Sequence, residues 1–148
     1  MQSLIYFSSA TKLLSDNDLI DILNISRINN ERHQITGLLI YHEGSILQIL
    51  EGTEDSLDII FDKIQKDNRH KGIMKFGNFS IAERSFPSWS MGFKKVSKED
   101  WSKLKGFTDL NNKDEFSWIA VSGNTRVITM IKAFANVNML NNINFESE

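Results

Sequence analysis

The feature that most constrains the fold is a pair of apolar segments joined by a very short connection. Residues 35–41 are apolar almost throughout, which predicts a central strand that is buried on both faces. Residues 45–50 follow after His42-Glu43-Gly44, in which glycine supplies a positive φ for a tight turn. Together the two segments predict a β-hairpin at the centre of a sheet.

Strand and helix patterns alternate on either side of the hairpin. Residues 3–8 predict a short strand. Residues 15–18 combine a serine with a carboxylate three positions later, which marks a helix start, and apolar residues recur at helical spacing behind it to about residue 30. A second helix is predicted between Thr53 and Asp67. Its apolar stripe is the clearest in the sequence and consists of Leu57, Ile60, Phe61 and Ile64.

Two further segments complete the predicted sheet. Residues 73–81 alternate weakly between apolar and polar side chains, which predicts a fourth strand. Residues 89–93 predict a fifth strand. Pro87 stands just before it, at a position where no backbone N–H is needed for hydrogen bonds of the sheet. The order strand, helix, hairpin, helix, strand, strand matches an α+β fold of the ferredoxin-like sandwich type, with a mixed five-stranded sheet and two helices on one face.

The end of the chain predicts a helical appendage. We expect one domain over residues 1–97 and a helical extension over residues 98–148. Within it, residues 98–105 predict a short helix and residues 124–140 an amphipathic one, before a polar tail that is expected to fray. The amphipathic helix would pack either on the open face of the sheet or in a subunit interface.

The composition excludes several classes of protein. The chain has no cysteine, which excludes disulfides, thiol catalysis and thiolate metal sites. A net charge of −2 leaves no basic stripe for nucleic acid. The longest apolar runs are far shorter than the roughly 20 residues of a membrane span, and the N-terminus lacks a signal-peptide pattern. We therefore expect a cytoplasmic protein with no membrane or nucleic-acid partner. No metal site is predicted, because the histidines show no ligand spacing.

Two polar side chains stand out within the apolar strands. Gln48 shares a face with Ile46 and Leu50, where an unsatisfied amide costs about 1–3 kcal/mol. It is either a glutamine satisfied by backbone or one that recognises the edge of a heterocycle, since an amide both donates and accepts. Tyr6 is either a core tyrosine or a redox-active phenol beside a cofactor, and the residues alone favour the core.

Other candidates have simpler explanations. Asn29 and Asn30 either cap the first helix, which the residues favour, or present amides to a ligand. Lys63 and Arg69 near the end of the second helix are either solvated surface or a phosphate site. Alternating large residues around Ser90 are more typical of core than of a cofactor wall. The catalytic alternative, a hydrolase or transferase with Glu51 and His70 as acid and base, has no accompanying nucleophile or oxyanion feature.

Six short segments occur in the order and spacing of one known family. They are residues 4–8, 26–30, 35–41, 48–52, 67–70 and 89–91. In combination they resemble the BLUF domain, a sensor of blue light using flavin, over about residues 2–96. Ile46 departs from the aromatic residue that is common at this position, which bears on spectral tuning and not on flavin binding.

The resemblance implies a flavin, FAD or sometimes FMN, bound noncovalently between the two helices and the sheet. Tyr6 matches the photoactive tyrosine of the family. Gln48 matches the glutamine that bridges this phenol to the flavin and rearranges by rotation or tautomerisation. Asn30 matches the asparagine that hydrogen-bonds the ring, and Asn29 is its neighbour.

The resemblance also assigns the remaining candidates. Lys63, Arg69 and His70 stand at positions that contact the phosphate or the ring edge in relatives, and Trp89 and Met91 match residues of the signal relay. It implies a photoreceptor and not an enzyme. We recognise no output domain after residue 97, so the signal would pass to a separate protein partner or to neighbouring subunits of a homo-oligomer. The alternative is a ferredoxin-like binding or assembly module that is insensitive to light.

Overall fold

The computed structural model describes residues 1–88, 90–95, 126–127, 129–131 and 133–134. The chain divides into two compact units, Met1–Lys95 and Val96–Glu148. The first unit contains β1 (Gln2–Ala10), α1 (Asp16–Arg32), β2 (Thr36–His42), β3 (Ser45–Gly52), α2 (Glu54–Lys66), β4 (His70–Ser80) and β5 (Gly92–Lys95).

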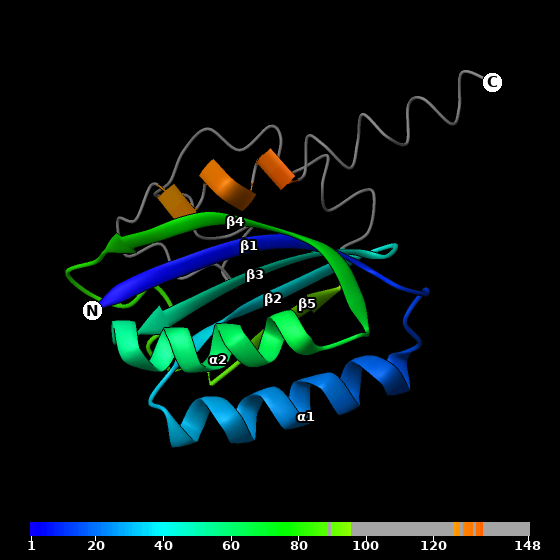
Figure 1. Ribbon diagram of the computed structural model, residues 1–148, viewed down its shortest axis with the longest axis horizontal. Coiled ribbons are helices and arrows are strands. Elements are labelled where there is room, and N and C mark those ends of the chain that lie inside the picture. The colour runs from blue at the N-terminus through cyan, green and yellow to red at the C-terminus, as the bar shows by residue number, and fades with distance from the viewer. Residues whose placement is uncertain (89, 96–125, 128, 132, 135–148) are drawn as a thin grey trace, which may run out of the picture. The chain divides into compact units, whose positions relative to one another are not determined.

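The sheet of the first unit has the strand order β4-β1-β3-β2-β5. Neighbouring strands are antiparallel except β2 and β5, which are parallel. Both helices cover the same face of this sheet (Figure 1). β3 lies between β1 and β2, which is the split β-α-β arrangement of ferredoxin-like folds. The predicted α+β sandwich with a mixed five-stranded sheet is therefore confirmed.

The predicted hairpin is confirmed together with its turn. β2 and β3 pair from His42–Ser45 to Thr36–Glu51. The two residues between them have positive φ, 44° at Glu43 and 89° at Gly44, as expected for a two-residue turn that matches the twist of the strands.

The first helix begins as predicted and ends later. Ser15 Oγ accepts from the backbone N–H of Asp18 at 3.1 Å, and the Asp18 carboxylate accepts from Ser15 N at 3.0 Å, a complete capping box. α1 then continues to Arg32, so the prediction that Asn29 and Asn30 cap it is wrong. The left-handed conformation after the helix falls on Gln34, with φ of 54°, and the backbone carbonyl of Asn30 accepts from Ile35 N at 2.8 Å.

The core between helices and sheet is apolar with a few polar members. One cluster joins side chains of β1, β2, β3, α1 and α2, and it includes Leu4, Leu19, Leu23, Leu39, Leu50, Leu57, Ile60 and Phe61. Not every apolar position of α1 belongs to it, because Ile20, Ile25 and Ile28 are 51–54% exposed. Periodicity alone therefore overstated the buried face of this helix.

The fifth strand is displaced from its predicted position. It begins at Gly92, so it shares only residues 92 and 93 with the predicted segment 89–93. The reason lies in the carbonyls of Ser90 and Met91, which accept from the side chains of Asn30 at 2.7 Å and Arg27 at 3.1 Å instead of forming a ladder.

The second unit is described only in part. Its described residues are helical, and Val127, Ile131 and Phe134 are buried, which agrees with the predicted amphipathic helix there. The predicted helix at residues 98–105 lies outside the described residues. Among the residues that the structure describes, no helix is long and apolar enough to cross a membrane.

Candidate functional site

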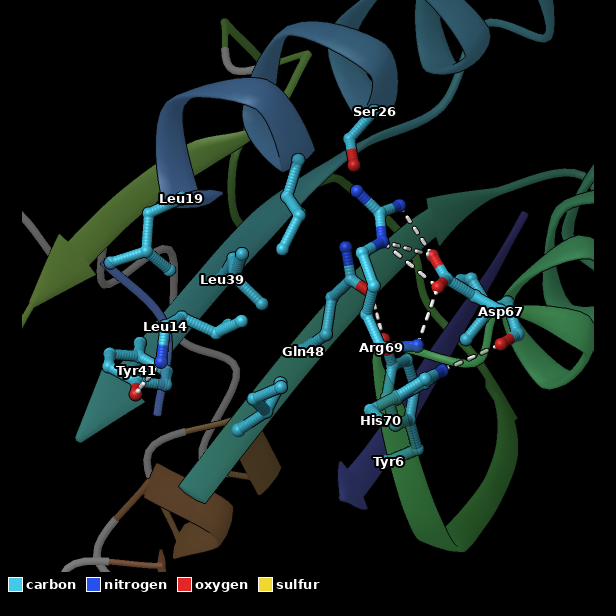
Figure 2. A pocket seen from close by; sticks show the side chains of 13 residues that line it. Tyr6, Leu14, Leu19, Ser26, Leu39, Tyr41, Gln48, Asp67, Arg69 and His70 are labelled. Atoms are coloured by element: carbon cyan, nitrogen blue, oxygen red, sulfur yellow. Dashed lines mark hydrogen bonds and ion pairs between the residues drawn. The ribbon is translucent and has the colours of Figure 1, made fainter. Parts of the chain in front are cut away.

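A cavity lies between α1, the C-terminal end of α2 and the helix-facing side of the sheet (Figure 2). Its empty volume, counted with the solvent space at its open mouth, is about 570 Å³. Its apolar lining is Leu14, Leu19, Ile22, Leu39, Ile46 and Ile64, and its polar lining is Tyr6, Ser26, Tyr41, Gln48, Asp67, Arg69 and His70. The predicted site residues Tyr6, Gln48, Arg69 and His70 are thus brought together in one wall.

Tyr6 and Gln48 form a hydrogen-bonded pair in this wall. They stand directly opposite each other on β1 and β3, and the Tyr6 hydroxyl donates to Gln48 Oε1. Gln48 Nε2 donates in turn to the thioether sulfur of Met91 at 3.5 Å. All three side chains are buried, so the amide of Gln48 is fixed between a phenol and a sulfur.

The Tyr6 phenol is held in its protonated form. Burial raises the pKa of Tyr6 well above its ordinary value, and the negative charge of Asp67 raises the pKa further. A neutral phenol is a hydrogen-bond donor, which is the role that Tyr6 takes toward Gln48.

Asp67 and Arg69 form an ion pair on the cavity lining, visible in Figure 2. Arg69 Nε lies 2.9 Å from Oδ1 of Asp67, and its Nη2 lies 2.5 Å from Oδ2, a two-pronged contact. The hydrogen bonds from Arg69 lower the pKa of Asp67, and the same carboxylate raises the pKa of Arg69. The pair therefore stays charged across the physiological pH range.

His70 is fixed by two hydrogen bonds. Nε2 lies 2.6 Å from the carbonyl oxygen of Ile64, and Nδ1 lies 2.9 Å from Ser8 Oγ. Because a carbonyl only accepts, Nε2 carries a proton and donates to it, while Nδ1 faces a hydroxyl that can both donate and accept. The ring lies 6.1 Å from that of Tyr6 between centroids, so His70 closes the wall behind the phenol.

The other candidates lie outside the cavity lining. Asn30 is buried and donates to the carbonyl of Ser90, while its neighbour Asn29 is half-buried in α1. Lys63 is exposed on α2. Met91 is buried against Gln48, and Trp89 lies outside the described residues.

A family model for "Sensors of blue-light using FAD" matches residues 1–92. The chain belongs to the BLUF family. BLUF domains are flavin-based sensors of blue light, so the family, sensor class and flavin cofactor expected from the sequence are confirmed.

The similarity extends to whole domains and to parts of larger proteins. The photoactivated adenylate cyclase subunit beta of Euglena longa is 34% identical over 92 residues, which is 62% of this chain and 11% of that protein. A BLUF protein, BlrB, in its dark state has a TM-score of 0.63 at 30% identity, over 92% of this chain and 96% of that one. Klebsiella pneumoniae BlrP1 with FMN and cyclic diGMP has a TM-score of 0.71 at 26% identity, over 91% of this chain and 34% of that one.

Sequence reasoning missed several residues that build this BLUF site. Ser8 shares a strand face with Tyr6, but its partner His70 is distant in sequence. The hydroxyl of Tyr41 accepts from Leu14 N at 3.0 Å and holds the loop before α1 against the cavity. The sequence suggests Glu51 as a general acid or base, yet its carboxylate binds backbone N–H groups and does not line the cavity that His70 lines.

Proposed function

We propose that this chain is a blue-light receptor that holds a flavin noncovalently in the cavity and switches through Tyr6 and Gln48. One observation carries the proposal. A protonated phenol and an amide share a hydrogen bond in the wall of a cavity, and the amide reaches a second buried partner, Met91, on the other side. A change in the amide therefore alters both contacts together.

The lining residues suit a flavin ring system. Ile22, Leu39 and Ile64 supply apolar surface for the faces of a flat ring. The amide of Gln48 supplies a donor and an acceptor for a polar ring edge. When bound, the flavin supplies the absorption of blue light and an excited state that takes an electron.

The switch begins from a neutral Tyr6. Its raised pKa keeps the proton on the phenol in the dark. In the light, we propose, the phenol gives up an electron and its proton moves toward Gln48 Oε1. The Gln48 amide then rotates or tautomerises, which exchanges its donor and acceptor positions relative to Tyr6 and to the cavity.

The remaining cofactor contacts are proposed with different support. Arg69 lines the cavity and is suited to a flavin phosphate, and His70 to the ring edge. Asn30, with Asn29, remains a proposed ring contact through the family resemblance, and Lys63 a second phosphate contact. FAD and FMN share the ring that this cavity would hold, and the family description names FAD while the BlrP1 structure contains FMN.

We propose that the light signal passes out of the sensor through Met91 and β5. The relatives include adenylate cyclase subunits of which the match spans about a tenth, for instance 11% in Euglena longa. We propose that residues 1–97 form the sensor and residues 98–148 a helical extension that conveys the signal to a separate protein or to a second copy of the chain in a homo-oligomer. Trp89 would take part in the relay beside Met91.

The decisive experiment is an absorption spectrum of the purified, flavin-loaded protein before and after blue light. We expect a flavin spectrum that shifts to the red, recovers in darkness, and keeps its position under light in Tyr6→Phe and Gln48→Leu. Bound flavin without any shift in the wild-type chain would contradict the switch and favour the light-insensitive module. Failure to bind flavin after reconstitution would contradict the receptor altogether.

A further inference from the structure

The connection between β4 and β5 has an unusual path. These two strands occupy opposite edges of the sheet, so the connection between them must pass the ends of the three strands in between. At the first of these ends, Ile81 N donates to the carbonyl of Met1 at 3.1 Å. We refer to residues 81–88 and 90–91, the described part of this connection, as the crossover segment.

The buried carboxylate of Glu51 holds the middle of the crossover segment. Glu51 is 0% exposed at the end of β3. Its Oε2 accepts from Ser85 N and its Oε1 from Phe86 N, each at 2.9 Å. A buried carboxyl group needs such partners, because an unsatisfied buried polar group costs free energy. Both oxygens therefore serve to fix two consecutive residues of the segment.

Arg84 anchors the same part of the crossover segment. Its Nη1 donates to the carbonyl of Glu51 and to Thr36 Oγ1, both at 2.8 Å, and its Nη2 donates to the carbonyl of Gln34 at 2.7 Å. The guanidinium thus joins the crossover segment to the end of β3 and to the start of β2. Phe86, the next residue but one, is 1% exposed and completes the anchor.

The crossover segment ends at the proposed switch. Five residues after Phe86, Met91 places its sulfur 3.5 Å from Gln48 Nε2. From α1, Arg27 and Asn30 donate to the carbonyls of Met91 and Ser90, and the crossover segment brings the chain from the Glu51 anchor to these contacts.

We propose that Glu51 is a positioning residue for the Tyr6–Gln48 pair, because its carboxylate fixes the crossover segment that holds the Met91 thioether against Gln48. The inference rests on the proposed function for its photochemical consequence. Glu51 stands on the opposite face of β3 from Gln48, by the alternation of side chains along a strand, and does not line the cavity. It acts on the switch through Met91 and not by touching a ligand.

The first test measures position without light. Glu51→Gln leaves one acceptor oxygen and turns an NH₂ group toward the second backbone N–H, so one anchor bond is lost. The chain has five methionines, whose methyl groups are resolved by ¹³C labelling and of which Met91 is assigned with Met91→Leu. We expect the Met91 methyl resonance to shift or broaden in Glu51→Gln and to stay unchanged in the exposed control Glu54→Gln. An unchanged Met91 resonance in folded Glu51→Gln overturns the inference.

The second test measures the photocycle of the full chain. We expect Glu51→Gln to bind flavin within about twofold of wild type and to recover in darkness about threefold more slowly. In a Met91→Leu background the same substitution should have no further effect, because the two residues act in series. If Glu51→Gln and Met91→Leu each slow dark recovery by a factor that simply multiplies in the double variant, Glu51 does not act through Met91.

The proposed switch and the proposed role of Glu51 can be contradicted independently of each other. A wild-type chain without a red shift contradicts the switch, while the methyl spectrum still decides whether Glu51 positions Met91. Glu51→Asp keeps the carboxyl group and withdraws it by one methylene, so it provides a milder second variant if Glu51→Gln does not fold. Its Met91 resonance should move in the same direction by a smaller amount, and an unmoved resonance counts against the inference.

Discussion

Gln48 directs its Nε2 atom at the sulfur of Met91, 3.5 Å away, while its Oε1 accepts from Tyr6. The orientation of this amide is therefore set from both sides, by a strong oxygen donor and by a weak sulfur acceptor. The weaker contact belongs to the segment that leads into β5, so a reorientation of the amide changes the contact with Met91 as well as the contact with Tyr6.

Met91→Leu tests this relationship directly. Leucine conserves the buried volume but removes the acceptor, which weakens the orientation that Gln48 has in the dark. We expect dark recovery to slow by about fivefold, equivalent to about 1 kcal/mol, with the size of the light-induced shift retained. The measurement is flavin absorbance after a blue pulse. Recovery at the wild-type rate would show that the sulfur contact does not orient the amide.

The raised pKa of Tyr6 predicts a loss of stability at high pH. In the unfolded chain the phenol titrates near its ordinary pKa of 10.0, whereas in the folded protein it keeps its proton to higher pH. The folded state then binds more protons than the unfolded state, so the free energy of unfolding decreases above about pH 10 by up to about 1.4 kcal/mol per pH unit. Below that pH the contribution of Tyr6 is fully present.

Tyr6→Phe isolates this contribution. Urea unfolding at several pH values between about pH 9 and about pH 11 should give a shallower decline for the variant, because all other titrating groups are common to both proteins. Parallel declines would mean that the Tyr6 phenol titrates equally in the folded and unfolded states, and its assignment as a buried neutral donor would fall.

The ion pair between Asp67 and Arg69 predicts a loss of stability at low pH, which we call the acid limb. The folded-state pKa of Asp67 lies below its ordinary value of 3.8, so its contribution is present above about pH 4 and is lost as the pH falls through the folded pKa. Both side chains are partly exposed, so screening limits the effect. Asp67→Asn should lower the free energy of unfolding at neutral pH by about 1 kcal/mol and flatten the acid limb.

Asp62→Asn is the matched control for the acid limb. Asp62 pairs with Lys66 one turn away at 2.9 Å, but both side chains are largely exposed. Such a pair contributes about 0.3–0.5 kcal/mol, and its removal should leave the slope below pH 4 almost unchanged. Equal slopes for the two variants would remove the special role given to Asp67.

The sequence was sufficient for local features and insufficient for contacts between distant segments. The Ser15 cap and the Glu43-Gly44 turn follow from residue chemistry over four positions or fewer, and both were predicted correctly. The fifth strand was misplaced because the carbonyls before it bind side chains of α1, some 60 residues earlier. No local pattern carries that information.

The same distinction applies to the site. The place of Gln48 in an apolar strand marked it as a candidate, because a buried amide needs partners. Its pairing with Tyr6 depends on the register of β1 against β3, and the role of Glu51 depends on a segment that crosses the sheet. Glu51 carried a visible signal, an acidic residue closing an apolar strand, but its partners are backbone groups that sequence does not single out.

Gly37 predicts the sharpest stability effect in the sheet. A Cβ atom built on Gly37 would lie 2.0 Å from the backbone carbonyl oxygen of Ile49 on β3, a distance that no side-chain adjustment can relieve. Gly37→Ala must therefore separate β2 from β3, and we expect it to lower the free energy of unfolding by about 3 kcal/mol, measured by urea unfolding. Gly52→Ala is the control, since the nearest atom to its Cβ would be Cγ1 of the Ile35 side chain at 3.1 Å, with backbone atoms no closer than 3.7 Å, and it should cost about 1 kcal/mol or less. If the two variants lose equal stability, the loss comes from the general effect of replacing glycine in a strand and not from the close approach of the hairpin strands at Gly37.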